Sequence, residues 1–395
     1  MIDFDALEAA NEPLNAFSDF DRTAAFGEGP LAGLTIGIKA NIAVAGMPWH
    51  AGLAAFETRL AERDADTVAL LRQAGAAIIG VLNMEEAALG AKTDNPHFGP
   101  VNNPHRASFS PGGSSGGSGA AVAAGLCDAA LGTDTMGSIR IPAAHCGVYG
   151  FKPATASVSQ EGLEPADLTL DAIGPLARDL DTLGRVARVI SGFGDDPLEG
   201  PGATLVEHGV EVDPEVASAF DAALAALGAP PVRVALSHPQ SRIRFAGFIG
   251  VAREMAAHLN GVTTSDRLAK LLAYGPRRNL ADWAEDRDVL TRTRDEVRAV
   301  VEEHGFLILP TVPNPPFAHA DPEPAAQADF TCLANIAGLP ALSLPAGWTA
   351  DGLPIGVQIV APAGAEGGLF ALARHLDQTL RAYRPPQPQP QPEGA

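Results

Sequence analysis

The chain has 395 residues, of which 46% are hydrophobic and 19% are charged, the composition of an ordinary globular protein. Its 27 basic and 47 acidic residues give a net charge of −20, which argues against binding to nucleic acid or to anionic membrane surfaces. The acidic N-terminus lacks a signal-peptide pattern, no run of 18 apolar residues occurs, and the three cysteines are widely spaced. We therefore expect a cytoplasmic protein.

The first part of the chain predicts alternating helices and strands. Residues 1–28 have the spacing of an amphipathic helical entry, residues 34–38 and 76–82 are typical of buried strands, residues 64–75 of a helix, and a further helix is expected to begin in residues 83–90. This β–α–β pattern predicts an α/β fold, a single large α/β/α sandwich around a mixed, mostly parallel sheet.

The second part continues the pattern less regularly. We expect helices after Pro175, near 213–227, near 285–304 and near 367–382, and strands at 306–310, 340–345 and 353–360. The domain prediction is one domain over residues 1–383, with core segments 29–181 and 306–360, a variable helical region at about 190–300, and a Pro/Gln-rich extended tail at 384–395.

Residues 111–142 hold two glycine-rich loops, each with a serine, Ser114 and Ser138. Glycine is used where the backbone must adopt unusual angles or approach a ligand closely. The N–H groups of such loops stabilise negative charge at helix starts, and a serine there can act beside an oxyanion hole. This stretch therefore indicates nucleophilic serine chemistry.

Familiar metal and cofactor motifs are absent from the sequence. It has no HExxH, no zinc-spaced cluster and no EF-hand, and its glycine-rich segment fits neither a P-loop nor GxGxxG, so we expect no metal and no cofactor. Residues 112–116 do match the GxSxG elbow of α/β-hydrolases, although 113–117 match it equally. That alternative needs a later histidine, and the candidates lie in undistinctive segments: His258, His304, His319 and His375.

Motifs along almost the whole chain closely resemble those of the amidase signature family. They are GPLAGLTIGIKANI (29–42), DADTVALLRQAGAAIIG (64–80), SPGGSSGGSGAAVAAG (110–125), GTDTMGSIRIPAAHCGVYGFKP (132–153), LDAIGPLARDLD (170–181), LILPTVP (307–313) and the run from NIAGLPALSLP to GLPIGVQIV (335–360). Only the middle, about 190–300, is unmatched. The resemblance implies the amidase signature fold and the cleavage of a carboxamide C–N bond.

The resemblance also implies a Ser–cis-Ser–Lys triad. Lys39 in IKAN matches the family's lysine, Ser114 its cis-serine after a cis Gly113–Ser114 bond, and Ser138 in MGSIR its nucleophile. Lys39 directly follows a predicted buried strand, and desolvation there would lower its pKa and make it a base. The expected oxyanion hole consists of backbone N–H groups, those of Thr135, Met136, Gly137 and Ser138.

Two positions depart from the family pattern. Ala40 stands where most members have Asp after the lysine, and Met136 stands where most have Gly. Because oxyanion donors are backbone groups, activity can survive this change, and we expect Met136 to line the acyl pocket, with Gly113 also in contact with substrate. Asp134 and Arg140 are expected to be structural, with Asp134 accepting N–H bonds of the loop and Arg140 pairing with a carboxylate.

We therefore expect a cofactor-independent amidohydrolase that acts on a small-molecule amide through a Ser138 acyl-enzyme, with Ser114 relaying protons to Lys39. The expected partners are this substrate and neither nucleic acid nor membrane, and a homodimer is allowed. Three alternatives stay open: the amidase-like subunit of a glutamine-dependent amidotransferase, an α/β-hydrolase-type serine esterase, and a pseudoenzyme that serves as a binding scaffold.

Overall fold

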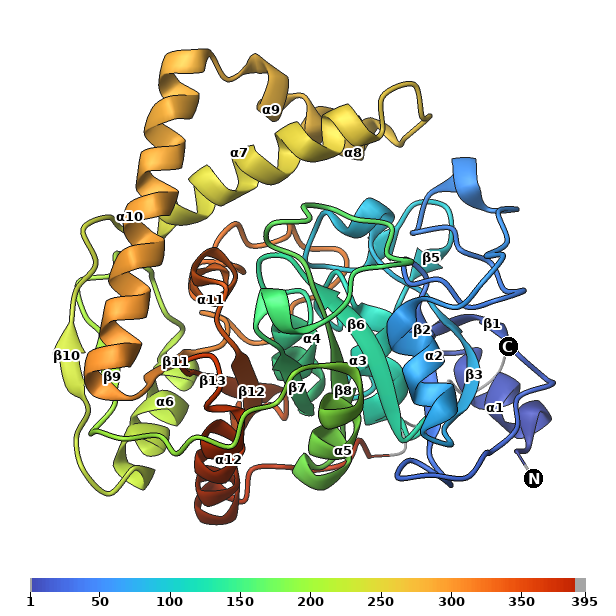
Figure 1. The fold of residues 1–395 in the computed structure, drawn as a ribbon, viewed down its shortest axis with the longest axis horizontal. Coiled ribbons are helices and arrows are strands. Elements are labelled where there is room, and N and C mark those ends of the chain that lie inside the picture. The colour runs from blue at the N-terminus through green and yellow to red at the C-terminus, as the bar shows by residue number, and fades with distance from the viewer. Residues whose placement is uncertain (1, 388–395) are drawn as a thin grey trace.

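The computed structural model describes residues 2–387, so most of the tail expected at 384–395 lies outside the described residues. An eleven-stranded sheet runs through the molecule in the order β1-β3-β2-β6-β8-β7-β12-β13-β11-β9-β10 (Figure 1). Its strands are β1 (Phe17–Phe20), β2 (Thr35–Lys39), β3 (Ala77–Leu82), β6 (Ala129–Asp134), β7 (Tyr149–Lys152), β8 (Ala172–Ala177), β9 (Ala203–Leu205), β10 (Val232–Val234), β11 (Leu307–Pro310), β12 (Ala341–Trp348) and β13 (Pro354–Val360). The two-residue strands β4 (Asp94–Asn95) and β5 (Gly99–Pro100) form a separate hairpin.

The helices pack on both faces of this sheet, with one group projecting beyond it. They are α1 (Phe4–Asn11), α2 (Asp66–Gln73), α3 (Gly116–Ala123), α4 (Arg140–Cys146), α5 (Leu180–Ile190), α6 (Pro214–Ala226), α7 (Gln240–His258), α8 (Asp266–Leu272), α9 (Tyr274–Arg277), α10 (Leu280–His304), α11 (Cys332–Ala337) and α12 (Glu366–Leu380). None of those in residues 2–387 combines the length and apolar character needed to cross a bilayer.

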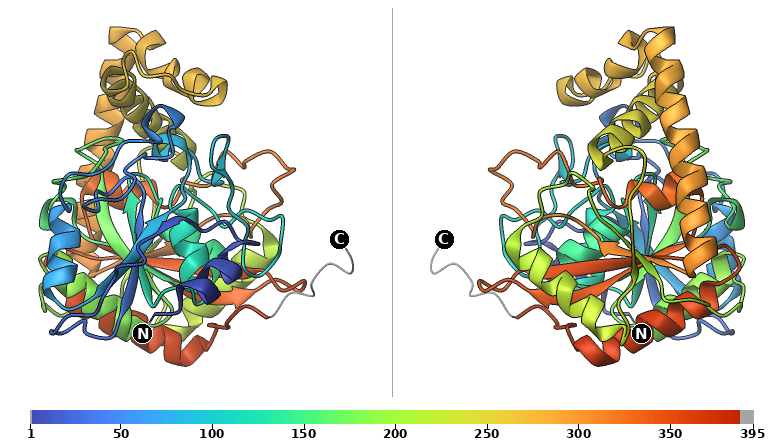
Figure 2. Two further views of the ribbon diagram at one scale, coloured as in Figure 1. Left: turned by 90° about the vertical axis from the view of Figure 1, so that its right-hand side faces the viewer. Right: turned by 90° about the vertical axis from the view of Figure 1, so that its left-hand side faces the viewer.

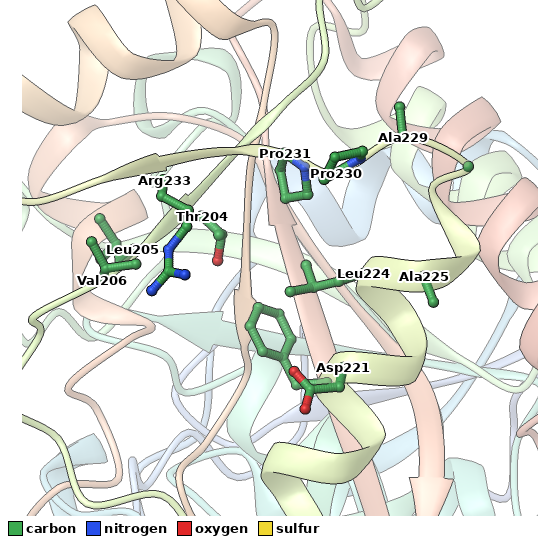
Figure 3. A pocket seen from close by; sticks show the side chains of 12 residues that line it. Thr204, Leu205, Val206, Asp221, Leu224, Ala225, Ala229, Pro230, Pro231 and Arg233 are labelled. Carbon is green, nitrogen blue, oxygen red and sulfur yellow. The ribbon is translucent and has the colours of Figure 1, made fainter.

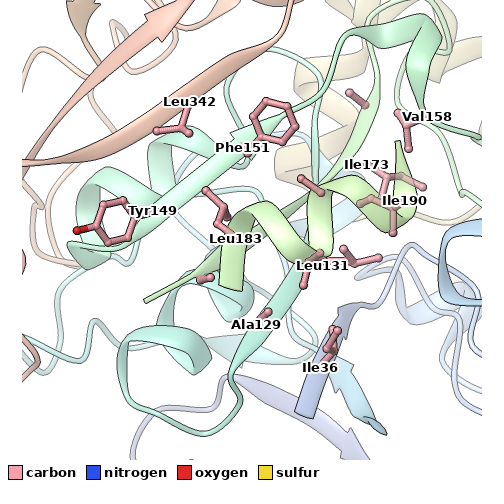
Figure 4. Packing of buried hydrophobic residues seen from close by; sticks show 14 of the residues in the cluster. Ile36, Ala129, Leu131, Tyr149, Phe151, Val158, Ile173, Leu183, Ile190 and Leu342 are labelled. Carbon is pink, nitrogen blue, oxygen red and sulfur yellow. The ribbon is translucent and has the colours of Figure 1, made fainter. Parts of the chain in front are cut away.

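The α/β sandwich is confirmed, and its layers follow from the buried side chains. One core cluster joins the sheet to α2, α5, α6 and α12, with Leu183 and Ile190 of α5 packed on Leu131 and Phe151 (Figure 4). A second cluster joins the opposite face to α1, α3 and α4. Figure 2 shows the helices on both sides of the sheet. The sheet is therefore largely buried, which is why its strands are nearly continuous apolar runs.

The prediction of a mostly parallel sheet is wrong. The pairings β3–β2–β6 and β11–β9–β10 are parallel, but those that run from β6 through β8, β7, β12 and β13 to β11 are antiparallel, as is β1–β3. Strand β8 inserts between β6 and β7, and β12 and β13 form a hairpin through a short turn, which antiparallel neighbours permit. The sheet is mixed, as predicted.

Three local predictions also need correction. Residues 172–177 form β8, and the helix expected after Pro175 begins only at Leu180, where the Asp179 side chain caps it by accepting from Thr182 N–H at 2.7 Å. Residues 83–90 contain only the 3₁₀ turn Glu86–Ala88, because Ala87 and Ala88 have left-handed φ angles of 49° and 60° that an α-helix cannot hold. Within the predicted helical entry, residues 17–20 form the edge strand β1.

Helices α7 to α10 (residues 240–304), here called the helical arm, project from one end of the sandwich (Figure 1). The sequence does not reveal α7, because its buried residues surround most of the helix: it packs against α8, α9, α10 and α11. Helix α10 lies close to the predicted stretch at 285–304, α6 to that at 213–227, and α12 to that at 367–382. The arm lies beside the loop that holds Ser138, and the two line one pocket.

Candidate active site

Lys39 is the last residue of β2 and is fully buried. Its Nζ lies 2.7 Å from Ser114 Oγ and 2.7 Å from Thr133 Oγ1 on the adjacent strand β6. Burial lowers the pKa of Lys39 to about 7, against the opposing pull of nearby carboxylates, of which Asp171 is the strongest. A large fraction of this lysine is therefore neutral near neutral pH, and a neutral amine can accept a proton.

Ser114 lies in the loop that leads into α3, and its preceding peptide bond, Gly113–Ser114, is cis, as the family resemblance implies. The Ser114 carbonyl accepts from Glu85 N–H at 3.1 Å. Gly113 is hemmed in by backbone, because an added Cβ would lie 2.9 Å from the Ala91 carbonyl carbon and from Lys92 N. The structure therefore places Gly113 against this neighbouring loop, and Gly113 does not line the pocket beside Ser138.

Ser138 lies between β6 and α4, and its residue is 9% exposed. Its carbonyl accepts from Ser115 N–H at 3.2 Å, which fastens the Ser138 loop to the Ser114 loop. Within residues 2–387 the Ser138 hydroxyl makes no hydrogen bond, and the residue lines a pocket. The structure thus brings Lys39, Ser114 and Ser138 into one region, as predicted, with Ser138 facing the open space.

The loop that carries Ser138 is shaped by Asp134, which is fully buried. Its carboxylate accepts from Gly137 N–H at 2.7 Å and Ile139 N–H at 3.2 Å, and it pairs with Arg140 at 2.9 Å. Burial alone would raise the pKa of Asp134, but the Arg140 guanidinium outweighs this and holds that pKa at about 2. The structural roles predicted for Asp134 and Arg140 are confirmed.

This arrangement narrows the choice of oxyanion donors. The Gly137 N–H already donates to Asp134, so it is not free for substrate in this conformation. The N–H groups of Met136 and Ser138, in contrast, have no acceptor within the described part of the chain. Both residues line the pocket, so their N–H groups remain the better placed of the four predicted donors.

Three residues that sequence reasoning missed hold this loop and the lysine in place. Thr133 Oγ1 contacts Lys39 Nζ, Thr135 Oγ1 donates to Asp171 Oδ1 at 2.5 Å, and Thr331 Oγ1 donates to the Met136 carbonyl at 2.7 Å. Burial raises the pKa of Asp171 to about 6. Thr133 and Asp171 lie inside motifs already singled out, but the contacts of Thr331 join distant segments and carry no local signal.

A pocket of about 440 Å³ opens beside Ser138, a size typical of small-molecule sites. Met136 lines it, as predicted, and also packs against the arm: a Cβ added at Gly247 of α7 would lie 2.9 Å from Met136 Cε. The rest of the lining comes from three segments, residues 88–91, residues 323–328 and the helical arm. The nucleophile loop and the arm therefore enclose the same space.

The histidine-dependent alternative finds no support in this geometry. The partner of Ser114 Oγ is Lys39. The four candidate histidines interact elsewhere, with Glu164 (His258), Glu303 (His304), the Val101 carbonyl (His319) and the Ala226 carbonyl (His375). A second hollow, of about 520 Å³ between α6 and the β9–β10 edge, has Asp221 and Arg233 as its charged side chains and no serine, cysteine, histidine or lysine in its lining (Figure 3).

Comparison with known families decides the kinship of the chain. The family described as Amidase matches residues 6–199 and 203–370. The chain belongs to the amidase family.

Individual relatives agree with this assignment to the amidase family. The glutamyl-tRNA(Gln) amidotransferase amidase-type chain of Methanothermobacter thermautotrophicus is 33% identical, covering 94% of this chain and 93% of that protein. The crystal structure of the protein of the same name from Thermotoga maritima superposes with a TM-score of 0.84 at 28% identity, covering 95% and 90% of the two chains. An inhibitor-bound structure from a vestigial complex related to s-triazine catabolism has a TM-score of 0.86 at 29% identity and covers 96% of each chain.

Proposed function

We propose that this member of the amidase family hydrolyses a carboxamide, with Ser138 as nucleophile, Ser114 as proton relay and Lys39 as general base. The observation that carries the proposal is the 2.7 Å contact between Ser114 Oγ and a fully buried Lys39 Nζ. A buried lysine with a pKa near 7 has the balance of protonation states that efficient general base catalysis at neutral pH needs.

The reaction proceeds in two halves. Ser138 Oγ attacks the amide carbon and passes its proton through Ser114 to Lys39, and the tetrahedral oxyanion forms. The C–N bond then breaks, the nitrogen takes a proton back along the same relay, and the amine leaves an ester on Ser138. In the second half water attacks that ester, again giving its proton to the relay, and the carboxylic acid leaves as Ser138 regains its proton.

The oxyanion is bound by the free N–H groups of Met136 and Ser138. Losing one effective donor of this kind typically costs about 2.7–4 kcal/mol of transition-state stabilisation. The bonds from Asp134 to Gly137 and Ile139 hold the loop in this shape before substrate arrives. Such preorganisation means that little of the loop has to move during the reaction.

Paired serine variants test the assignment. We expect Ser138→Ala to lose turnover and labelling by a fluorophosphonate while it unfolds at the wild-type temperature. Ser114→Ala should keep a labelled Ser138 but react more slowly, because the relay to Lys39 is broken. If Ser138→Ala retains the wild-type kcat and Ser114→Ala resists the label, Ser114 is the nucleophile and the proposal fails. If neither protein nor wild type is ever labelled, the pseudoenzyme alternative replaces it.

A second candidate function, the ammonia-producing subunit of an amidotransferase, is favoured by the names of the relatives at 33–36% identity. Such a subunit would hydrolyse glutamine within a complex. The test is gel filtration of the isolated chain, which also reports a homodimer, followed by a glutaminase assay. Glutamine hydrolysis that appears only after addition of partner subunits would favour this candidate over an independent amidohydrolase.

A further inference from the structure

We propose that the pocket beside Ser138 selects amides whose acyl group is uncharged and aromatic or branched aliphatic. This inference rests on the proposed function, since it assigns a substrate class to the same site. It differs from what glutamine hydrolysis would require, which is a place for a free amino acid with both an ammonium and a carboxylate group.

The walls of the pocket are mainly apolar. Phe245, Phe248 and Val251 of α7 contribute to them together with Leu271 of α8, and Met136 contributes from the nucleophile loop. The Tyr274 ring meets Phe248 edge-on, with 5.7 Å between ring centroids, and extends the aromatic wall. Burial of an apolar group against such side chains is favourable roughly in proportion to the area removed from water.

The charged side chains at this pocket already have partners. Arg244 Nε donates to Asp329 Oδ1 at 2.5 Å. Glu323 accepts from Ala91 N–H at 3.0 Å and pairs with Arg267 of α8 at 2.9 Å. A zwitterionic ligand would have to compete with these bonds while losing its own hydration, which is costly. A neutral acyl group needs no such exchange.

The position of the proton relay assigns the pocket to the acyl side of the amide. Ser138 lines the pocket, whereas Ser114 and Lys39 are fully buried and do not. The leaving nitrogen has to receive its proton through Ser114, so it must face Ser114. The acyl group, on the other side of the carbonyl carbon, then extends toward Met136 and α7.

Two isomeric amides separate these possibilities. Phenylacetamide carries its ring on the acyl side, and acetanilide carries the ring on nitrogen. We expect kcat/KM for phenylacetamide to exceed that for acetamide by about 10- to 100-fold, the range that burial of a ring in an apolar pocket supplies. We also expect it to exceed the values for acetanilide and for L-glutamine. A higher value for L-glutamine or for acetamide overturns the inference, and one for acetanilide overturns the acyl-side assignment.

Variants locate the selectivity in the pocket wall. Phe248→Ala should lower the ratio of kcat/KM for phenylacetamide to that for acetamide about tenfold. Leu280→Ala truncates an arm residue that is 79% exposed and outside the pocket lining, and it should leave the ratio unchanged. An equal ratio in all three proteins contradicts the inference.

Binding to a Ser138→Ala protein gives a readout that needs neither turnover nor a stable Phe248 variant. Calorimetry should show phenylacetamide binding at least tenfold more tightly than acetamide or L-glutamine. If wild-type enzyme is labelled at Ser138 but L-glutamine binds this variant better, the substrate class is wrong and the proposed function stands. If phenylacetamide binds better yet Ser138 is never acylated, the pocket is correct and the proposed catalytic role fails. Absence of any preference overturns the inference.

Discussion

At the residue scale, the central feature is a lysine that has lost its contact with water. Lys39 is carried into the interior by β2, and its ammonium form is disfavoured there because burial removes hydration. Asp171, Asp134 and Glu85 act in the opposite sense and keep its pKa from falling further. Ala40, which replaces the usual Asp, leaves one fewer carboxylate next to this lysine.

The pH dependence of hydrolysis should report this lysine. Because only the neutral amine accepts a proton, kcat/KM should rise about tenfold per pH unit below a pH of about 7 and level off above it. Lys39→Met, which keeps the length of the side chain, should lower kcat/KM by about 10²–10⁴-fold or more. A flat profile from pH 5 to 10, or a near-normal rate in Lys39→Met, contradicts the role of Lys39.

Asp134 offers a second test at this scale. Asp134→Asn leaves the fully buried Arg140 without its counter-charge, and loss of one partner of a buried pair typically costs about 3–5 kcal/mol of folding free energy. Urea unfolding should show this loss, and kcat of the folded fraction should fall because the loop is no longer held. Asp351→Asn, which removes the 62% exposed partner of Arg106, is the matched control and should change little. Equal effects of the two variants would mean that Asp134 does not organise the loop.

Sequence reasoning identified Lys39, Ser114 and Ser138 because each lies in a contiguous motif. It missed Thr331 and the Gly137 bond to Asp134, since those depend on contacts that only the folded chain creates. It also assigned Gly113 to substrate, whereas the glycine is explained by the close approach of the backbone of residues 91–92.

At the scale of elements, the nucleophile loop and helix α7 meet at one point. Met136 fills the space that the missing side chain of Gly247 leaves, with its flexible end nearest. Gly247 has no left-handed φ, so its backbone can accept alanine. The pair therefore sets the width of the pocket between nucleophile and arm.

A double-mutant cycle tests this contact. Met136→Gly should admit bulkier acyl groups while modestly lowering kcat on acetamide, because glycine loosens the loop. Gly247→Ala should push Met136 toward the pocket and lower kcat/KM for large acyl groups more than for acetamide. In the double variant the second change should cost less, with a coupling of about 0.5–3 kcal/mol. Strict additivity, or equal loss on both substrates in Met136→Gly, would show that Met136 only packs.

The elements themselves were predictable where the local pattern was strong. The strands at 76–82, 306–310 and 353–360 are buried apolar runs, and they agree with β3, β11 and β13. Helix α7 and the three-residue strands β9 and β10 were not predictable, because α7 is buried on several sides and the strands are too short for a pattern. The delayed start of α5 followed from Pro175 lying within the sheet and from the cap at Asp179.

At the scale of the whole molecule, the site arises from the order of the strands. Strands β2 and β6 are parallel neighbours, so Lys39 at the end of one lies beside Thr133 and Asp134 at the end of the other. Strand β3 separates them in the chain but not in the sheet. The strand order and the mixed directions could not be read from the sequence, because neighbouring strands here are often distant in the chain. The arm then closes the site with side chains from the region that lacks a family match.

The most direct test of the proposed chemistry is the location of the acyl group during turnover. Enzyme mixed with phenylacetamide or its 4-nitrophenyl ester analogue is quenched in acid within the first turnovers, digested and mapped by mass spectrometry. We predict a phenylacetyl ester on Ser138, more abundant in wild type than in Lys39→Met and absent from Ser138→Ala. An ester on Ser114 in wild type, or turnover at the wild-type rate without any ester on Ser138, would contradict Ser138 as the nucleophile.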